Sequence, residues 1–86
     1  MHELSVALEI CRMAEERLSP ERRPRLRQVG VIVGDDAGIE PGNLEFCLEA
    51  LLAQPPFGRA IPAIQRSQGD ELALAWLQVE DDGPDH

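Results

Sequence analysis

Apolar residues recur every three or four positions from Leu4 to Leu18, a pattern that predicts an amphipathic helix. The main stripe consists of Leu4, Ala7, Leu8, Cys11, Ala14 and Leu18. Val6, Ile10 and Met13 widen the apolar face, so we expect this helix to pack on its own sheet and to leave surface for a partner. Ser19-Pro20 ends the helix, because proline donates no backbone hydrogen bond and disfavours helical geometry in the residue before it. The next residues, 21–23, are predicted to form a solvated connection.

The middle of the chain predicts a strand followed by a second helix. The strand spans Arg25 to Val33, where valines occupy every second position near the end and Gly30 leaves room for a close neighbour. The helix starts at Ile39-Glu40-Pro41, with the proline in the first turn. Its predicted buried stripe is Leu44, Cys47, Leu48, Leu51 and Leu52. Glu40 stands at the helix N-terminus, where the helix dipole favours a carboxylate, so capping is the simplest interpretation of this residue.

The last third of the chain predicts two strands. Arg59 to Arg66 is the first, and Pro62 within it implies an edge position or a bulge. A tight turn at Ser67-Gln68-Gly69-Asp70 connects it to Glu71–Val79, so we expect these two strands to form a hairpin. The order helix, strand, helix, strand, strand predicts an α+β fold, with two helices on a three-stranded mixed β-sheet. We expect one domain over residues 1–80 and a disordered acidic tail over residues 81–86.

Composition indicates which classes of partner the protein can bind and in which cellular compartment it is expected. The net charge of −8 and the aromatic content of 3% disfavour nucleic-acid binding, and the charge suits a basic protein partner. No apolar run has membrane-spanning length, and Glu3 and Glu9 stand where a signal peptide carries basic and apolar residues. We therefore expect a cytoplasmic protein that does not enter a membrane. Cys11 and Cys47 are predicted to be reduced core residues, and without a CxxC pair we expect no zinc site.

The first three residues, Met1-His2-Glu3, form a potential metal chelate. The α-amino group, the backbone nitrogen of His2 and an imidazole nitrogen of His2 hang from adjacent parts of the chain and can close two fused rings on one ion. Three nitrogens in one plane suit Ni(II) or Cu(II), and the Glu3 carboxylate is close enough to assist. On chemistry alone, an ordinary solvated terminus is the commoner alternative. His86 and its neighbouring aspartates form a second group, but nothing fixes their geometry.

Three stretches of the sequence resemble the HypA/HybF family of hydrogenase-maturation nickel metallochaperones. They are Met1-His2-Glu3-Leu4-Ser5-Val6-Ala7-Leu8; Gly34 with Gly38-Ile39-Glu40-Pro41, Leu44 and Phe46; and Gly69 with Glu71-Leu72 and Val79-Glu80-Asp81. They follow the family's order and span almost the whole chain. The resemblance implies the nickel-binding domain of that family, with a non-catalytic role in maturing nickel-iron hydrogenases and, in some bacteria, urease.

The resemblance also implies a site and partners. His2 would be the principal ligand of a labile Ni(II), with the amine of Met1, the backbone of His2 and the carboxylate of Glu3 completing the site. Glu40 would contribute a carboxylate from the neighbouring loop. The implied partners are the hydrogenase large subunit, the maturation GTPase HypB or both, and formation of a homodimer stays open.

One departure from the family concerns the last two strands. The family normally inserts a zinc-binding domain with two CxxC pairs between them, whereas here Arg66-Ser67-Gln68-Gly69 closes the gap. Removal of the insertion should leave the sheet intact. Two hypotheses therefore stay open: a zinc-free protein that delivers nickel, and an adaptor or assembly factor that keeps the fold but delivers none. An enzyme ranks third, because the sequence holds no Ser/His/Asp set, no nucleophilic cysteine with an adjacent base and no nucleotide loop.

Overall fold

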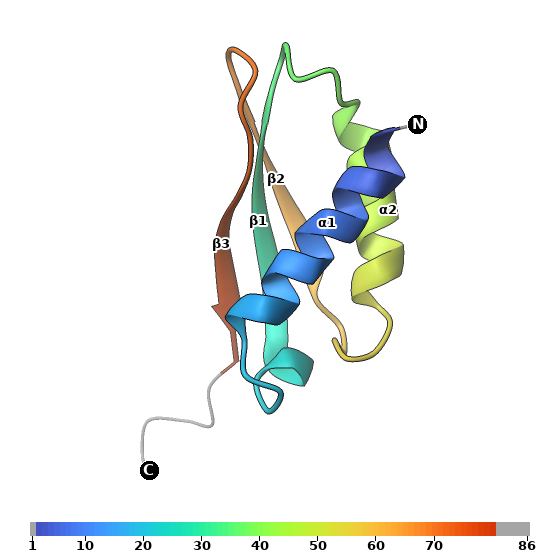
Figure 1. The fold of residues 1–86 in the computed structure, drawn as a ribbon, viewed down its shortest axis with the longest axis vertical. Helices are drawn as coiled ribbons and strands as arrows, with labels where there is room; N and C mark the ends of the chain where they lie inside the picture. The colour runs from blue at the N-terminus through green and yellow to red at the C-terminus, as the bar shows by residue number, and fades with distance from the viewer. Residues whose placement is uncertain (1, 81–86) are drawn as a thin grey trace.

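The structure is a computed structural model that describes residues 2–80. Its elements are α1 (His2–Arg17), the short 3-10 helix η1 (Arg23–Arg25), β1 (Leu26–Gly34), α2 (Pro41–Leu52), β2 (Ile61–Ser67) and β3 (Leu72–Val79), shown in Figure 1. This order confirms the predicted α+β fold of two helices and three strands. The predictions for Met1 and for the tail, residues 81–86, lie outside the described residues. None of the described helices is both long and apolar enough to cross a membrane.

The sheet has the strand order β2-β1-β3. β1 pairs with β2 in parallel and with β3 antiparallel, so the sheet is mixed as predicted. The predicted hairpin is wrong, because β2 and β3 lie on opposite edges and each pairs with β1. The physical reason is the apolar content of β1, whose buried residues include Leu26, Val29, Val31 and Val33. A strand this apolar belongs in the centre of a sheet, where neighbours cover both of its edges.

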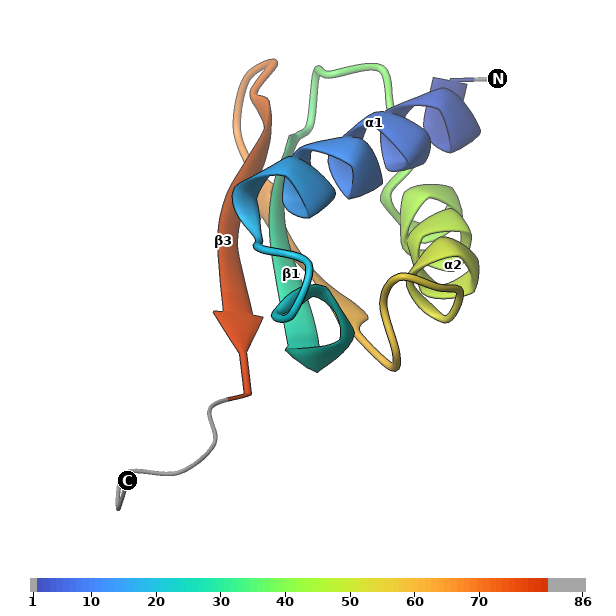
Figure 2. The ribbon, with the colours of Figure 1, turned by 60° about the horizontal axis from the view of Figure 1, so that its bottom comes forward.

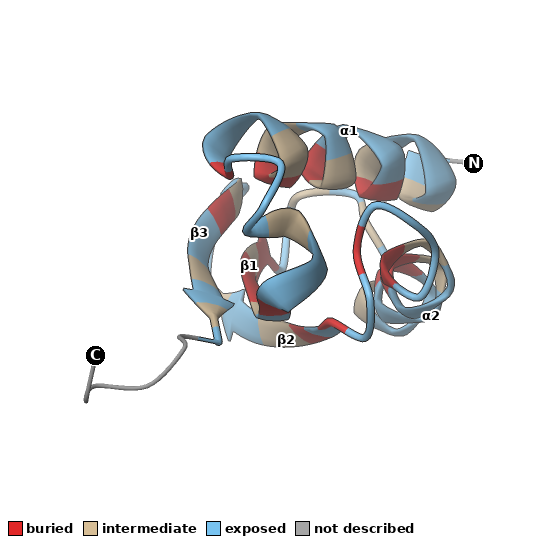
Figure 3. Cartoon of the chain, turned by 90° about the horizontal axis from the view of Figure 1, so that it is seen from below, coloured by how far each residue is buried: buried red, intermediate tan, exposed pale blue. Residues whose placement is uncertain are grey.

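Both helices cover the same face of the sheet, as Figure 2 shows, and the core lies between the two layers. In Figure 3 the buried parts of α1 and β1 face each other across this layer. α2 buries Leu44, Leu48 and Leu52, as predicted. In α1 the predicted stripe is only partly correct, because Leu4 and Leu8 are 49% and 51% exposed. Ile10 is buried instead, together with the small residues Ala7 and Ala14. The face of α1 that packs on the sheet is therefore rotated about the helix axis from the predicted one.

Gly30 of β1 lies beneath the ring of Trp76 of β3 on the sheet face that carries no helix. A Cβ atom at Gly30 would lie 2.1 Å from Cε2 and 2.3 Å from Nε1 of Trp76. The two residues are direct partners in the antiparallel register. The close neighbour expected at Gly30 is therefore confirmed, and it is the protein's one tryptophan.

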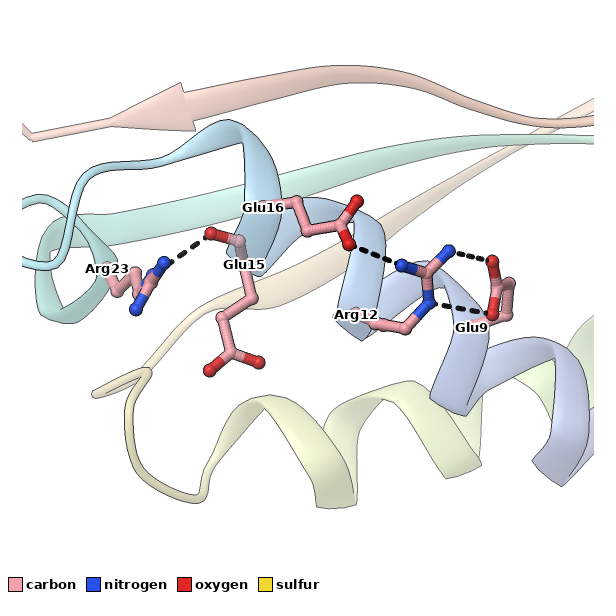
Figure 4. A network of polar contacts seen from close by, with 5 residues as sticks. All are labelled: Glu9, Arg12, Glu15, Glu16 and Arg23. Atoms are coloured by element: carbon pink, nitrogen blue, oxygen red, sulfur yellow. Dashed lines mark hydrogen bonds and ion pairs between the residues drawn. The ribbon is translucent and has the colours of Figure 1, made fainter.

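The connection after α1 is more ordered than predicted. Arg23 is half-buried, and its Nε donates hydrogen bonds to the backbone oxygens of Glu15 (3.0 Å) and Leu18 (3.2 Å). It thus satisfies carbonyl groups that the end of a helix leaves unpaired. The predicted solvated connection is wrong at this residue. Figure 4 shows the contact to Glu15 beside the exposed ion pairs that Arg12 makes along α1, which contribute little to stability.

Candidate metal site at the two helix N-termini

Glu3 connects the first turn of α1 to the start of α2. Its Oε2 accepts a hydrogen bond of 2.9 Å from the backbone N–H of Glu40, 37 residues further along the chain. Glu40 is the N-cap of α2, and its Oε1 accepts a bond of 2.7 Å from the backbone N–H of Asn43. The structure thus joins two of the four predicted site residues, Glu3 and Glu40, and His2 is the chain neighbour of Glu3. The fourth, Met1, lies outside the described range.

The Glu3 carboxylate is held in its charged form. The hydrogen bond from the Glu40 backbone, the largest influence, lowers the pKa of Glu3 below its ordinary value of 4.5. At neutral pH this end of α1 therefore carries a fixed negative charge next to His2. Glu40 adds a second carboxylate, whose Oε2 accepts no hydrogen bond from any other described residue.

His2 is exposed and is the first residue of α1. The first four N–H groups of an α-helix have no partner within the helix, so the helix does not occupy the backbone nitrogen of His2. The N-termini of α1 and α2 both direct partial positive charge toward this region, which by itself repels a cation. Glu3 and Glu40 place carboxylates at these two helix starts and offset that partial positive charge.

More carboxylates gather at the same end of the molecule, the upper end in Figure 1. The loop after β1 and the turn before β3 are bonded through their backbones. Asp35 N–H donates to Ser67 O at 2.8 Å, and Asp36 N–H donates to Gly69 O at 2.7 Å. These two loops carry Asp35, Asp36, Asp70 and Glu71. The ion pair of Asp35 with Arg66, at 2.7 Å, neutralises one of these charges. A negative end raises the local concentration of cations, including metal ions.

Gly34 makes this closure sterically possible. A Cβ atom at Gly34 would lie 2.3 Å from the backbone oxygen of Gly69 and 2.7 Å from the backbone nitrogen of Glu71. Gly34 N–H also donates to Glu71 O at 2.6 Å. The turn that joins β2 to β3 is therefore packed directly onto the end of β1. It forms part of the acidic end and does not project from it.

Side chains of the described residues do not form a metal site by themselves, and this includes His2, Glu3 and Glu40. Within residues 2–80, no group of three or more His, Cys, Asp or Glu side chains has a geometry suited to a metal ion. Cys11 and Cys47 are free and half-buried, as expected for thiols that pack against a core. Burial raises the pKa of the Cys11 thiol to about 11, so this sulfur stays protonated at neutral pH and is a poor ligand. The nitrogen ligands at the N-terminus are the stronger candidates.

Sequence reasoning identified Glu40 as a cap but missed the bond between Glu40 and Glu3. The capping role had a local signal, a carboxylate directly before Pro41 at a helix start. The bond to Glu3 joins residues in different elements, and no periodicity or spacing in the sequence encodes it. The acidic cluster was likewise visible only as two separate loops until the fold placed them together.

Comparison with known proteins places the chain in a family. A family model described as "Hydrogenase/urease nickel incorporation, metallochaperone, hypA" matches residues 1–70. The chain is 32% identical over 69 residues to the hydrogenase maturation factor HypA of Pelodictyon phaeoclathratiforme, which covers 80% of this chain and 59% of that protein. It is 40% identical over 50 residues to the HypA of Chlorobium limicola, covering 58% of this chain and 43% of that protein. The chain thus spans 59% or less of the length of these relatives. It belongs to the HypA family of nickel-incorporation metallochaperones.

Proposed function

We propose that this protein binds Ni(II) at its N-terminus and delivers it during the maturation of a nickel-iron hydrogenase. The observation that carries the proposal is the hydrogen bond between Glu3 and Glu40, which holds the His2-bearing start of α1 against the acidic start of α2. Family membership supports nickel as the metal. The proposal requires that the amine of Met1 be free in the working protein.

The proposed ligands are the amine of Met1, the backbone nitrogen of His2 and an imidazole nitrogen of His2. Together they occupy three corners of a square plane, the geometry that Ni(II) accepts from nitrogen donors. Glu3 and Glu40 belong to the site through their negative charge, which compensates the ion and the two helix dipoles. The fourth corner stays available to a ligand from the receiving protein, so nickel can leave by ligand exchange.

The proposed recipients are the hydrogenase large subunit and the GTPase HypB, and we place the transfer in the cytoplasm, where Cys11 and Cys47 stay reduced. The acidic end around Glu3 and Glu40 is the part of the surface that would face the recipient, because the nickel ion lies there. A basic surface on the recipient would complement it.

Titration of the metal-free protein with Ni(II), followed by calorimetry and visible absorption, tests the proposal. We expect one site per chain and a loss of at least about 100-fold in affinity for His2→Ala, since removal of a direct ligand costs more than removal of a supporting group. His86→Ala, which changes the only other histidine, serves as the matched control and should bind like the wild type. An extension before Met1 should also abolish binding. Unchanged affinity in His2→Ala would overturn the assignment.

A second candidate function is an adaptor that binds a hydrogenase subunit without carrying nickel. Three exposed apolar side chains on the helices favour it: Leu4, Leu8 and Phe46, of which Phe46 is 71% exposed. Binding of a purified hydrogenase large subunit should be compared between wild type and His2→Ala, with and without Ni(II). Equal binding in all four combinations supports the adaptor. Binding that depends on both nickel and His2 supports delivery.

A further inference from the structure

We propose that the groove between α1 and the free edge of β3 binds a short, extended, basic segment of a partner protein. The segment would pair with β3 as a fourth strand of the sheet. This inference is independent of the nickel proposal, because it uses none of the proposed nickel ligands and needs no metal.

The first observation is the unprotected edge of β3. β3 pairs with β1 on one side, and no described strand lies on its other side. Its eight residues, Leu72–Val79, include no charge and no proline. The other edge strand, β2, contains Pro62 and packs against α2. Proline and covering helices are devices that keep sheet edges from pairing with other chains, so only β2 is protected in this way.

The second observation is an apolar groove of about 280 Å³ beside this edge. It is lined by Val6, Ile10 and Met13 from α1 and by Leu72, Ala73 and Leu74 from β3, with Ser5 and Glu9 completing the lining. A strand added to β3 would run roughly 4.8 Å from it, and alternate side chains of that strand would point toward α1. Those side chains would fill the groove while the backbone of the added strand pairs with β3. One extended segment would therefore satisfy both the strand edge and the groove.

A bulge limits the length of this pairing. Gly30 pairs with Trp76 and Val31 pairs with Leu74, so Ala75 has no partner on β1 and interrupts the regular strand. The stretch that adjoins the groove is therefore Leu72–Leu74. Three residues of backbone pairing plus one or two side chains in a groove indicate a reversible interaction, as a transient partner requires.

Charge decides which occupant fits. Asp70 and Glu71 directly precede β3, and Glu9 lines the groove. No described residue makes a side-chain hydrogen bond or ion pair with Asp70 or Glu71. A second copy of this chain, with a net charge of −8, would bring its own carboxylates to the same place. A segment with lysine or arginine beside its apolar residues would instead gain attraction at the entrance of the groove, so we assign the groove to a basic peptide of another protein.

Selection from a random library of phage-displayed ten-residue peptides on the intact protein tests this assignment. Selected peptides, once synthesised, should carry a net positive charge and alternate apolar residues. The amides of Leu72–Leu74 should gain protection from hydrogen exchange when such a peptide binds. They would either form backbone hydrogen bonds with the peptide or lose contact with water.

Two charge reversals on α1 form a matched pair for this test. Glu9→Arg and Glu16→Arg each remove one ion-pair partner of Arg12 and change the charge equally, but only Glu9 lines the groove. We expect Glu9→Arg to weaken peptide binding at least tenfold and Glu16→Arg to change it less than threefold. Ser5→Trp, which fills the groove from an exposed position, should also abolish binding.

Four results would overturn the inference. They are a selection that yields no binder, binders that are acidic, equal effects of Glu9→Arg and Glu16→Arg, and a dimer in analytical ultracentrifugation that Glu9→Arg disrupts. The last result would show that a second copy occupies the groove.

Discussion

Two substitutions of Glu40 separate its role as a helix cap from a role as a nickel ligand. Glu40 is the N-cap of α2, and its side chain accepts a 2.7 Å hydrogen bond from the backbone N–H of Asn43. Glu40→Ala removes this acceptor, which costs about 1 kcal/mol. Glu40→Ser keeps an acceptor of the kind most favoured at this position, and its extended backbone conformation before Pro41 suits serine equally well. Both variants lose the carboxylate, so they differ only in the cap.

The expected magnitudes follow from these contacts. For a domain of this size, 1 kcal/mol corresponds to a decrease in Tm of about 4–8 °C, so Glu40→Ala should melt lower by that amount and Glu40→Ser should melt near the wild type. If Glu40 acts on nickel only through its charge, a carboxylate roughly 10 Å from a divalent ion in water contributes about 0.8 kcal/mol, or about fourfold in Kd. Both variants should show this same fourfold loss.

Differential scanning calorimetry and Ni(II) titration on the same samples check both expectations. The backbone N–H of Glu40 still donates to Glu3 in every variant, so the start of α1 stays in place. An equal decrease in Tm for the alanine and serine variants would refute the capping argument. A loss of nickel affinity far above tenfold in Glu40→Ser, at unchanged Tm, would refute the charge-only role and identify Glu40 as a direct ligand.

Two further predictions concern the first turn of α1 and the sheet. Because the pKa of Glu3 is lowered in the folded state, its charge stabilises the protein above about pH 4.5, and this contribution disappears as pH falls through the lowered pKa. Thermal melts should therefore show a lower Tm for Glu3→Gln than for wild type at pH 7, and the two Tm values should converge as the pH falls below the lowered pKa; a difference that stays constant with pH would contradict the argument. Gly30→Ala should lower the free energy of unfolding by about 1–3 kcal/mol, since the new methyl group overlaps the indole ring of Trp76. The same overlap should shift the fluorescence of Trp76. In a Trp76→Ala background the same substitution should cost much less, and a full penalty there would mean that the indole is not the obstacle.

The sequence predicted the elements of the fold better than their arrangement. Alternating valines placed β1 to within one residue at each end, and α2, predicted to start at Ile39-Glu40-Pro41, begins at Pro41. The turn Ser67-Gln68-Gly69-Asp70 was read as a hairpin, because turn residues mark where the chain reverses and do not say which strands become neighbours. That choice depended on β1, whose apolar residues require a neighbour on each side.

The candidate site shows the same division between local and long-range information. The chelate of Met1 and His2 depends on adjacent atoms of the chain, so sequence alone could propose it. The support for that chelate comes from residues far apart in sequence: Glu3 reaches Glu40 across the helical layer. Leu4 and Leu8 could not be distinguished from Ile10 as core residues, because periodicity fixes an apolar face of a helix only to within about one residue position.

The closed turn between β2 and β3 explains how the acidic end keeps its shape without an inserted domain at that point. In this chain, Gly34 lets the turn approach the end of β1, and three backbone hydrogen bonds of 2.6–2.8 Å join residues 34–36 to residues 67–71. The same loop continues through Gly38 to Glu40, which bonds to Glu3. The turn, the loop and the start of α1 are therefore one connected set of contacts. A change at Gly34 should consequently reach the start of α1 through the backbone of Glu40 and its bond to Glu3.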